Sequence, residues 1–176
     1  MTAVTIPTLE TERLTLRRPA PRDWEPFRAF MMSDRAAGIG GPLDLGKAWR
    51  AFAAELGHWE ILGFGMWVVT IRGDDTGVGM VGPWFPPDWP ETEVGWMIWD
   101  ESLEGTGIAC EAARAAIAHA WHRLKWKTVV SYVAPDNARS RALAERLGAR
   151  IDPQAPQPMP DKPCLVYRHP APEKLQ

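Results

Sequence analysis

The segment Glu104-Gly105-Thr106-Gly107-Ile108-Ala109-Cys110-Glu111 combines residue types and spacing that suit phosphate binding. Its two glycines permit a tight turn, and a long amphipathic pattern follows directly. The first turn of an α-helix leaves backbone N–H groups unpaired at the positive end of the helix dipole. Such a helix start binds phosphate or pyrophosphate without a charged side chain. We therefore expect a phosphorylated ligand here, while the alternative is that the glycines only allow a tight turn.

Two common phosphate-binding motifs do not fit this segment. A P-loop requires Gly-Lys-Ser or Gly-Lys-Thr after its glycines, whereas Ile108 follows Gly107. A dinucleotide-binding fold places its glycine motif after the first strand of a repeated βαβ array. Here the glycines follow four predicted strands, and no such array comes after them. The pattern therefore disfavours both a nucleoside triphosphate and a dinucleotide.

The elements that lead to the glycine turn follow from hydrophobic periodicity. Apolar or alternating runs predict strands at 14–18, 66–71, 78–84 and 93–99. Apolar residues at helical spacing predict a helix from Trp24 to Met31 with Asp23 as its cap. A second predicted helix ends at Gly63 and carries an inner stripe of Trp49, Phe52, Ala53, Leu56 and Trp59.

The elements after the turn complete an α/β (or α+β) pattern. The sequence predicts a helix at 107–124, a strand at 129–133, a helix at 137–147, a proline-rich segment at 153–163 and a strand at 164–168. This order predicts a single mixed central sheet of about seven strands flanked by about four helices. The strand–helix–strand unit ending at 133 should pair in parallel with a right-handed crossover. The length of 176 residues suggests a single domain over 1–176.

Composition limits the possible partners. The net charge of −2 and the pI near 6.1 argue against nucleic acid as a main partner. No apolar run approaches the roughly 20 residues of a membrane helix, and the charged segment 8–13 lacks a signal core. We therefore expect a cytoplasmic protein with no membrane partner. Cys110 and Cys164 fit neither a disulfide framework nor a zinc site, and His119 and His122 lack a third ligand, so no metal is expected.

Four motifs in order resemble the GNAT superfamily of N-acetyltransferases, in particular its RimJ/RimL-like branch. The family's Gln/Arg-x-x-Gly-x-Gly/Ala cofactor motif is similar to 104–109, extended by Glu111-Ala112. The other three are an opening strand at 11–17, the loop Gly40-Gly41-Pro42, and Asn137-Ala138-Arg139-Ser140 followed by Leu143 and Leu147-Gly148-Ala149. The resemblance implies the GNAT fold, in which the fourth and fifth strands, 93–99 and 128–133, splay apart.

The resemblance implies acetyl-CoA (coenzyme A) as the cofactor. Its pyrophosphate would bind the backbone N–H groups of Gly105, Thr106, Gly107, Ile108, Ala109 and Cys110. Its pantetheine arm would pair with the backbone of Met97, Ile98 and Trp99. Asn137 would bond a pantetheine amide or else act only as a helix cap. Arg139 and Arg141 are candidates for the 3′-phosphate, although arginines on a short helix are usually solvated.

One residue departs from the family pattern. Glu104 stands where the family usually carries Gln, Arg or an aromatic residue, and a carboxylate repels pyrophosphate. Either Glu104 turns outward and caps the helix, or cofactor binding is weakened. Because backbone N–H groups do most of the binding, we expect the first and still count Glu104 among the cofactor-site residues.

The resemblance also implies the chemistry, which is transfer of an acetyl group to a primary amine by direct attack in a ternary complex. Glu93 is the candidate base, directly or through water, with Glu91 in reserve. Ser140 would protonate the leaving thiolate, because Leu143-Ala144 stands where many relatives carry a tyrosine.

The acceptor is an amine, either a protein N-terminus or a small molecule. Its predicted binding residues are Gly40, Gly41, Trp84 and Trp96. A homodimer is possible because exposed aromatic residues would suit one. The alternative function is a non-catalytic acyl-CoA-binding module that retains the cofactor cradle.

Overall fold

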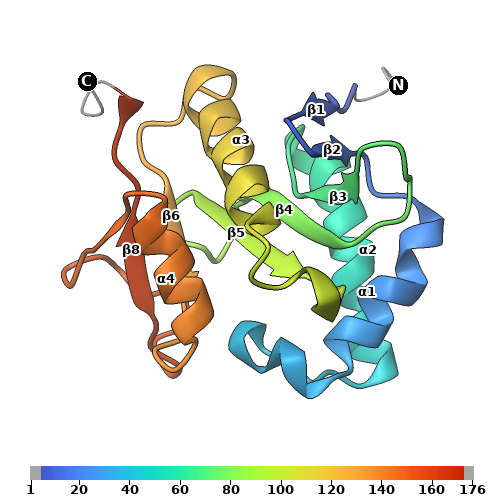
Figure 1. Ribbon diagram of the computed structural model, residues 1–176. Coiled ribbons are helices and arrows are strands. Elements are labelled where there is room, and N and C mark those ends of the chain that lie inside the picture. Colours follow the sequence, from blue (N-terminus) through green and yellow to red (C-terminus); the bar gives the residue numbers. More distant parts are fainter. Residues whose placement is uncertain (1–4, 173–176) are drawn as a thin grey trace.

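The computed structural model describes residues 5–172, and these form one mixed sheet with helices on both faces (Figure 1). Residues 1–4 and 173–176, the ends of the predicted 1–176 domain, lie outside the described residues. Within the described range the sheet has eight strands in the order β1-β2-β3-β4-β5-β6-β8-β7. They are β1 (Leu9–Glu10), β2 (Leu14–Arg17), β3 (Trp67–Ile71), β4 (Gly79–Trp84), β5 (Glu93–Ile98), β6 (Val130–Val133), β7 (Arg150–Ile151) and β8 (Leu165–Arg168). Neighbours pair antiparallel except β5 and β6, which are parallel as expected.

The helices cover the two faces of the sheet separately. They are α1 (Trp24–Met31), α2 (Leu45–Leu62), α3 (Ile108–His122) and α4 (Ala138–Arg146), with 3-10 helices η1 (Pro21–Asp23), η2 (Asp34–Ile39) and η3 (Glu101–Leu103). Alternation along the strands assigns neighbouring residues to opposite faces. Val69 and Val81 pack with α3, whereas Val68 and Met80 pack with α1 and α2. Figure 1 shows α3 and α4 in front of the sheet and α2 behind it.

Strands β5 and β6 separate after a short contact, which confirms the predicted splay. Their only paired position in the sheet register is Glu93 with Val130. Around it, the Val130 N–H donates to the Thr92 carbonyl at 3.0 Å, and the Ser131 hydroxyl donates to the Val94 carbonyl at 2.6 Å. Beyond this end, one edge of β5 has no strand partner, so backbone groups on that edge face the gap.

Two details of the predicted elements differ from the structure. The sheet has eight strands and not about seven, because β1 and β7 contain only two residues each and give no periodic signal. Asp23 precedes α1 but does not cap it by a side-chain hydrogen bond. Its carboxylate instead accepts hydrogen bonds from Arg17 and from the Ala20 N–H.

The inner stripe of α2 is rotated from the predicted one. Trp49 is 56% exposed and meets Trp24 edge-on, with ring centroids 5.1 Å apart. The buried residues of α2 are Ala48, Phe52, Glu55, His58 and Trp59. Hydrophobicity alone predicts that the large Trp49 is buried in preference to the small Ala48. It gives no reason to expect that Glu55 is buried. The predicted end of this helix is confirmed at Gly63, which has a φ of +75°.

Candidate active site

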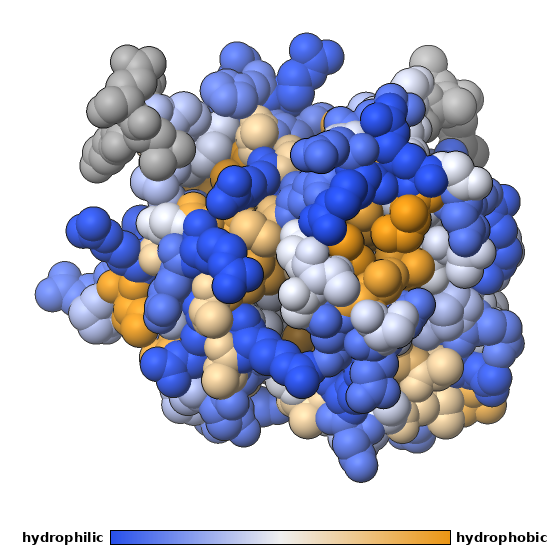
Figure 2. Space-filling view, in the orientation of Figure 1, coloured by the Kyte–Doolittle hydropathy of each residue, from blue (hydrophilic) through white to orange (hydrophobic). Residues whose placement is uncertain are grey.

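A cavity of about 460 Å³ lies where η2, the end of β5, the start of α3 and α4 meet. Ten of the predicted site residues line it: Trp96, Met97, Ile98, Glu104, Gly105, Gly107, Ala109, Cys110, Asn137 and Ser140. Residues that the sequence did not indicate also line it, among them Arg35 and Gly38 of η2. Figure 2 shows hydrophilic residues gathered over this part of the molecule, between the start of α3 and α4. The structure therefore brings most of the predicted cofactor residues together at one place.

The glycine turn has the backbone geometry that a helix-start anion site requires. Gly105 and Gly107 have φ values of +74° and +86°, a region that side chains other than glycine rarely adopt. Gly107 is the N-cap of α3, and the Glu111 N–H makes a helical bond to the Gly107 carbonyl at 3.1 Å. The N–H groups of Ile108, Ala109 and Cys110 precede that bond, so they are the donors without helical partners.

Thr106 differs from its neighbours in the turn and does not line the cavity. Its N–H donates to the Leu103 carbonyl at 3.3 Å, and its hydroxyl donates to the same carbonyl at 2.6 Å. Arg13 in turn donates to the Thr106 carbonyl at 3.0 Å. Thr106 therefore stabilises the turn and does not offer its N–H to a ligand. The free N–H donors are those of the first turn of α3, the later half of the stretch that the sequence suggested.

Glu104 does not turn outward to cap α3, so that expectation is wrong. Its carboxylate is partly buried in the cavity wall, where it forms ion pairs with Arg35 at 2.6 Å and with Arg139. Two guanidinium groups thus face one carboxylate, and the three side chains together carry one net positive charge. This arrangement offsets the repulsion that a lone glutamate would exert on a phosphate group.

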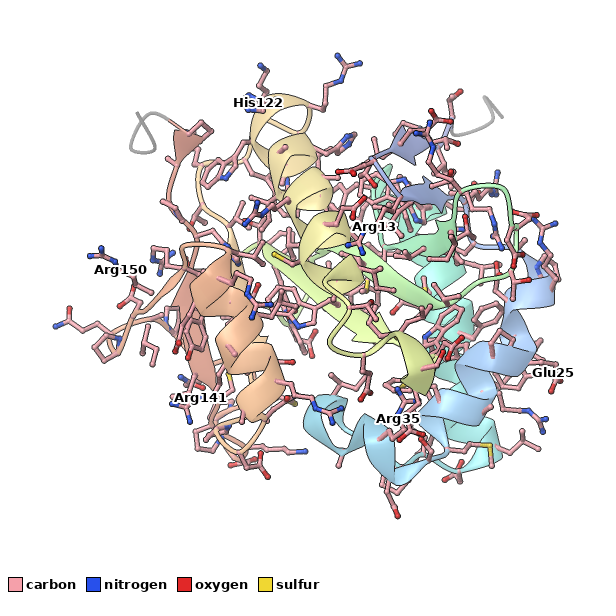
Figure 3. The ribbon with its side chains drawn as sticks, viewed as in Figure 1. Arg13, Glu25, Arg35, His122, Arg141 and Arg150 are labelled. Carbon is pink, nitrogen blue, oxygen red and sulfur yellow. The ribbon has the colours of Figure 1, made fainter. Side chains whose placement is uncertain are left out.

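Arg35 connects η2 to the end of β5, and Figure 3 shows it where these elements meet. Its guanidinium donates to the Trp99 carbonyl at 2.7 Å and to the Ile98 carbonyl at 3.0 Å, and lies 5.2 Å from the centre of the Phe30 ring. No local sequence pattern marks this residue, because its role depends on packing between distant segments. Arg141 lies on the other side of α4 and donates to the Pro135 carbonyl at 3.2 Å (Figure 3).

The backbone N–H of Trp99, predicted to pair with the pantetheine arm, is already hydrogen-bonded within the sheet. Trp99 is buried against Phe27, and its N–H donates to the Val78 carbonyl at 2.8 Å. In an antiparallel pair such bonds recur at every second residue, so Met97 also points its backbone toward β4. Ile98 and Trp96 consequently direct their backbone groups toward the gap beside β6.

Asn137 and Ser140 occupy the start of α4. Asn137 is the N-cap, and its side-chain oxygen accepts the Ser140 N–H at 3.1 Å. Its amide nitrogen lies against Gly38, where an added Cβ would come within 2.4 Å of it. The Ser140 hydroxyl accepts a hydrogen bond from the Trp96 indole at 3.2 Å. The cap role of Asn137 is therefore real, while the Ser140 proton has no acceptor assigned to it within residues 5–172.

Trp96 lies on a different face from the one its predicted acceptor role requires. Side chains alternate along β5, so Glu93, Gly95 and Met97 face α1 and α2, whereas Trp96 faces α3 and α4. Its indole bridges β5 to Ser140 on the cofactor side. This placement contradicts the grouping of Trp96 with Trp84 in one acceptor wall.

Glu93 lies at the start of β5 and is partly buried. Its carboxylate accepts the Trp89 indole N–H at 2.6 Å and the Tyr132 N–H at 3.5 Å. Burial raises the pKa of Glu93 to about 7, so this carboxyl group changes charge near neutrality. Glu91 instead accepts two hydrogen bonds from Arg168, at 2.7 and 3.1 Å, and is occupied in that ion pair.

The remaining predicted acceptor residues lie beside the cavity and do not line it. Gly40 and Gly41 follow η2, whose residues Gly38 and Ile39 line the cavity in their place. Trp84 stacks on His58, with ring centroids 4.4 Å apart and an interplanar angle of 15°. His58 was not indicated by the sequence. Burial lowers its pKa to about 4, and it accepts the Phe85 N–H at 3.1 Å.

The described part of the chain contains neither a metal-binding cluster nor a membrane-spanning helix. Residues 5–172 include no group of three or more His, Cys, Asp or Glu side chains placed to hold a metal ion. None of the described helices has both the length and the apolar character that crossing a membrane would require.

Comparison with known proteins identifies the family. Residues 13–150 match the model of the acetyltransferase (GNAT) domain. An acetyltransferase from Agrobacterium tumefaciens str. C58 is 43% identical, with a TM-score of 0.89 over 94% of this chain and 95% of that one. A GNAT-family acetyltransferase from Bacillus anthracis is 20% identical, with a TM-score of 0.71 over 92% and 95% of the two chains.

The fold also matches a structure of RimL, a ribosomal L7/L12 α-N-protein acetyltransferase, in complex with coenzyme A. That protein is 16% identical, with a TM-score of 0.70 over 94% of this chain and 98% of the other. At this identity the likeness concerns the fold alone. The family match over 13–150 and the 43% identical relative carry the assignment: this chain belongs to the GNAT family of acetyltransferases.

Proposed function

We propose that this protein transfers an acetyl group from acetyl-CoA to a primary amine, by direct attack of the amine in a ternary complex within one domain over residues 1–176. The observation that carries the proposal is the meeting of three features at one cavity. These are the glycine turn before α3, the open edge of β5, and Ser140 at the start of α4. The turn suits a pyrophosphate, the open edge suits an extended amide chain, and the serine suits a leaving thiolate.

The residues present fit coenzyme A. The N–H groups of Ile108, Ala109 and Cys110 would hold the pyrophosphate, with added positive charge from Arg35 and Arg139. A Cβ built at Gly105 meets no atom within 4 Å, so there is open space in front of the turn. The backbone of Trp96 and the N–H of Ile98 would pair with the amides of the pantetheine arm, since the Ile98 carbonyl already accepts a hydrogen bond from Arg35. When bound, acetyl-CoA supplies an activated thioester.

Glu93 is the proposed base. A carboxyl group with a pKa of about 7 is poised to accept a proton at neutral pH. Glu93 and Met97 share one face of β5, and Met97 lines the cavity whereas Glu93 does not. We therefore infer that Glu93 acts on the amine through water. Ser140 would donate its proton toward the leaving sulfur, because its oxygen already accepts the Trp96 indole N–H.

The test combines two measurements on the full chain. Acetyl-CoA should raise the melting temperature by mass action, and free thiol should appear when acetyl-CoA meets a panel of primary amines. A thermal shift without thiol release from any amine would favour the non-catalytic acyl-CoA-binding module. The absence of both at a millimolar excess of acetyl-CoA would contradict the proposed cofactor site itself.

A further inference from the structure

A second group of polar side chains lies on the face of the sheet covered by α1 and α2. Glu55 and His58 sit about one turn apart on the inner side of α2, and each is only 7% exposed. His58 stacks on Trp84, and Trp84 is the direct cross-strand partner of Glu93. These contacts bring Glu55 of α2 toward Glu93 of β5, away from the cofactor turn on the other side of the sheet.

The carboxyl group of Glu55 is not satisfied by the protein. Its Oε2 is buried and has no hydrogen-bond partner among residues 5–172. An unpaired buried polar group lowers the stability of the fold, and lowers it more when the group is charged. Within the same range, neither Glu55 nor Glu93 forms an ion pair with a basic side chain. Glu55 and Glu93 thus lie on the same side of the sheet, and no basic side chain of residues 5–172 pairs with either.

The surroundings of the pair favour a small cation. Gly95 has no side chain between Glu93 and Met97, and a Cβ built there lies 3.6 Å from the Glu93 carboxylate. Trp84 and Trp89 contribute aromatic surface nearby, a setting that suits organic cations.

The other ionisable groups near Glu93 do not supply a positive charge. Glu91 is neutralised by Arg168, and His58 stays neutral because burial lowers its pKa to about 4. The Tyr132 hydroxyl and the Cys164 thiol are neutral when protonated and anionic when deprotonated, so neither supplies a positive charge.

We propose that Glu55 and Glu93 together bind the acceptor as an alkylammonium ion, so that the acceptor is an aliphatic primary amine and not a peptide α-amine. This inference rests on the proposed function. Aliphatic amines have pKa values near 10.4 and enter as cations, whereas α-amino groups near 7.7–8.0 are partly neutral at the same pH. Glu55 is a positioning residue, and Glu93 is the residue that takes the proton.

The transfer step balances with these residues. The ammonium gives one proton, through a bridging water, to the Glu93 carboxylate, and its nitrogen lone pair attacks the thioester carbonyl carbon. A C–N bond forms as the C–S bond breaks, and a second nitrogen proton replaces the one that Ser140 gives to the sulfur. Glu93 then releases its proton to water.

The pair should also titrate in a characteristic way. Burial, and then the nearby Glu93 charge, raise the pKa of Glu55 to about 8, whereas that of Glu93 is raised to about 7. The groups are coupled, so the two values belong to the pair. Alkylamine binding should strengthen as each carboxyl ionises.

Direct binding tests the inference independently of turnover. Butylammonium chloride should raise the melting temperature of the wild-type chain at a pH above 8, where both carboxyl groups are ionised and the amine is still a cation, whereas neutral butanol should not. Glu55→Gln should abolish this shift, and Glu60→Gln, an exposed substitution on the same helix, should retain it. Glu55→Met serves as a second variant if Glu55→Gln folds poorly. An equal shift in the Glu55 variants and the wild type, or no shift in any of them, would overturn the inference.

Kinetic constants provide a second test, because a purely structural role of Glu55 would not change the KM for the amine selectively. In Glu55→Gln the KM for butylamine should rise at least about tenfold, which corresponds to about 1.4 kcal/mol, with an unchanged Kd for acetyl-CoA. The pH profile of kcat/KM should change from two ionisations in the wild type to a single ionisation in Glu55→Gln. If acetyl-CoA binds but no thiol is released with any amine, the proposed acetyl transfer is wrong. The butylammonium melting experiment still shows whether Glu55 and Glu93 bind an alkylammonium ion. Better turnover of a peptide α-amine than of butylamine would contradict the inference.

Discussion

Glu104 and Arg35 form an ion pair of 2.6 Å that joins the turn before α3 to η2, two segments far apart in the sequence. The same guanidinium holds the carbonyl groups at the end of β5. A residue that looked unfavourable for phosphate binding is therefore part of a positively charged arrangement. This pair thus links η2 to the glycine turn across the cavity that both segments line.

Arg35→Ala should lower the affinity for coenzyme A by about tenfold or more, because it removes a cation and exposes the Glu104 carboxylate to the phosphates. Isothermal titration at two salt concentrations measures the effect, with Arg28→Ala of α1 as the control. The double variant Arg35→Ala/Glu104→Gln should recover part of the loss, since the coupled residues are not additive. Additive effects of the two substitutions would contradict a shared role.

Gly105→Ala should weaken coenzyme A binding, because its Cβ would project into the open space in front of the turn. Gly63→Ala at the end of α2 is the matched control: the two glycines have φ values of +74° and +75°, and neither has an atom within 4 Å of a built Cβ. Both variants should lose about 1 kcal/mol of stability from backbone strain. Equal coenzyme A affinity in the two variants would place the pyrophosphate elsewhere.

Glu93→Gln should reduce kcat by about 100-fold or more, as expected for loss of a general base. In the wild type, kcat/KM should rise with pH through about 7, because only the ionised carboxylate accepts a proton. Glu91→Gln should keep this pH profile, since Glu91 is engaged with Arg168. A profile that disappears in Glu91→Gln and survives in Glu93→Gln would reverse the two assignments.

Ser140→Ala should lower kcat by about tenfold or more while leaving the Kd of acetyl-CoA nearly unchanged, because the hydroxyl acts on the leaving sulfur. Ser102→Ala in η3 is the control, because the Ser102 hydroxyl donates to the Asp100 carboxylate that caps this short helix. Stopped-flow thiol detection separates the chemical step from product release. Unchanged kcat in Ser140→Ala would leave water as the proton donor.

The sequence predicted those parts of the fold and the site that depend on local chemistry. The glycine turn and the helix after it were recovered because glycines and hydrophobic periodicity report directly on backbone conformation. The splayed strands were expected only from the resemblance to the GNAT superfamily. The end of α2 at Gly63 followed for the same reason.

Features set by tertiary packing were missed. Arg35 is one arginine among many until η2 meets β5, and Glu55 looks like a surface residue until α2 buries it. Trp96 was predicted to bind the acceptor because it is one of several tryptophans close in the sequence, although alternation along β5 turns it toward Ser140. The strand period could have placed Trp96 correctly, whereas no signal in the sequence marked Arg35.

The most direct test of the account is thiol release by the full chain from acetyl-CoA in the presence of a panel of primary amines, with Glu93→Gln measured alongside. We predict amine-dependent release by the wild type, strongest with aliphatic amines, and loss of most of that rate in Glu93→Gln. Amine-dependent release that is equal in both proteins would contradict the proposed mechanism. No release with any amine, despite binding of acetyl-CoA, would contradict the proposed acetyl transfer.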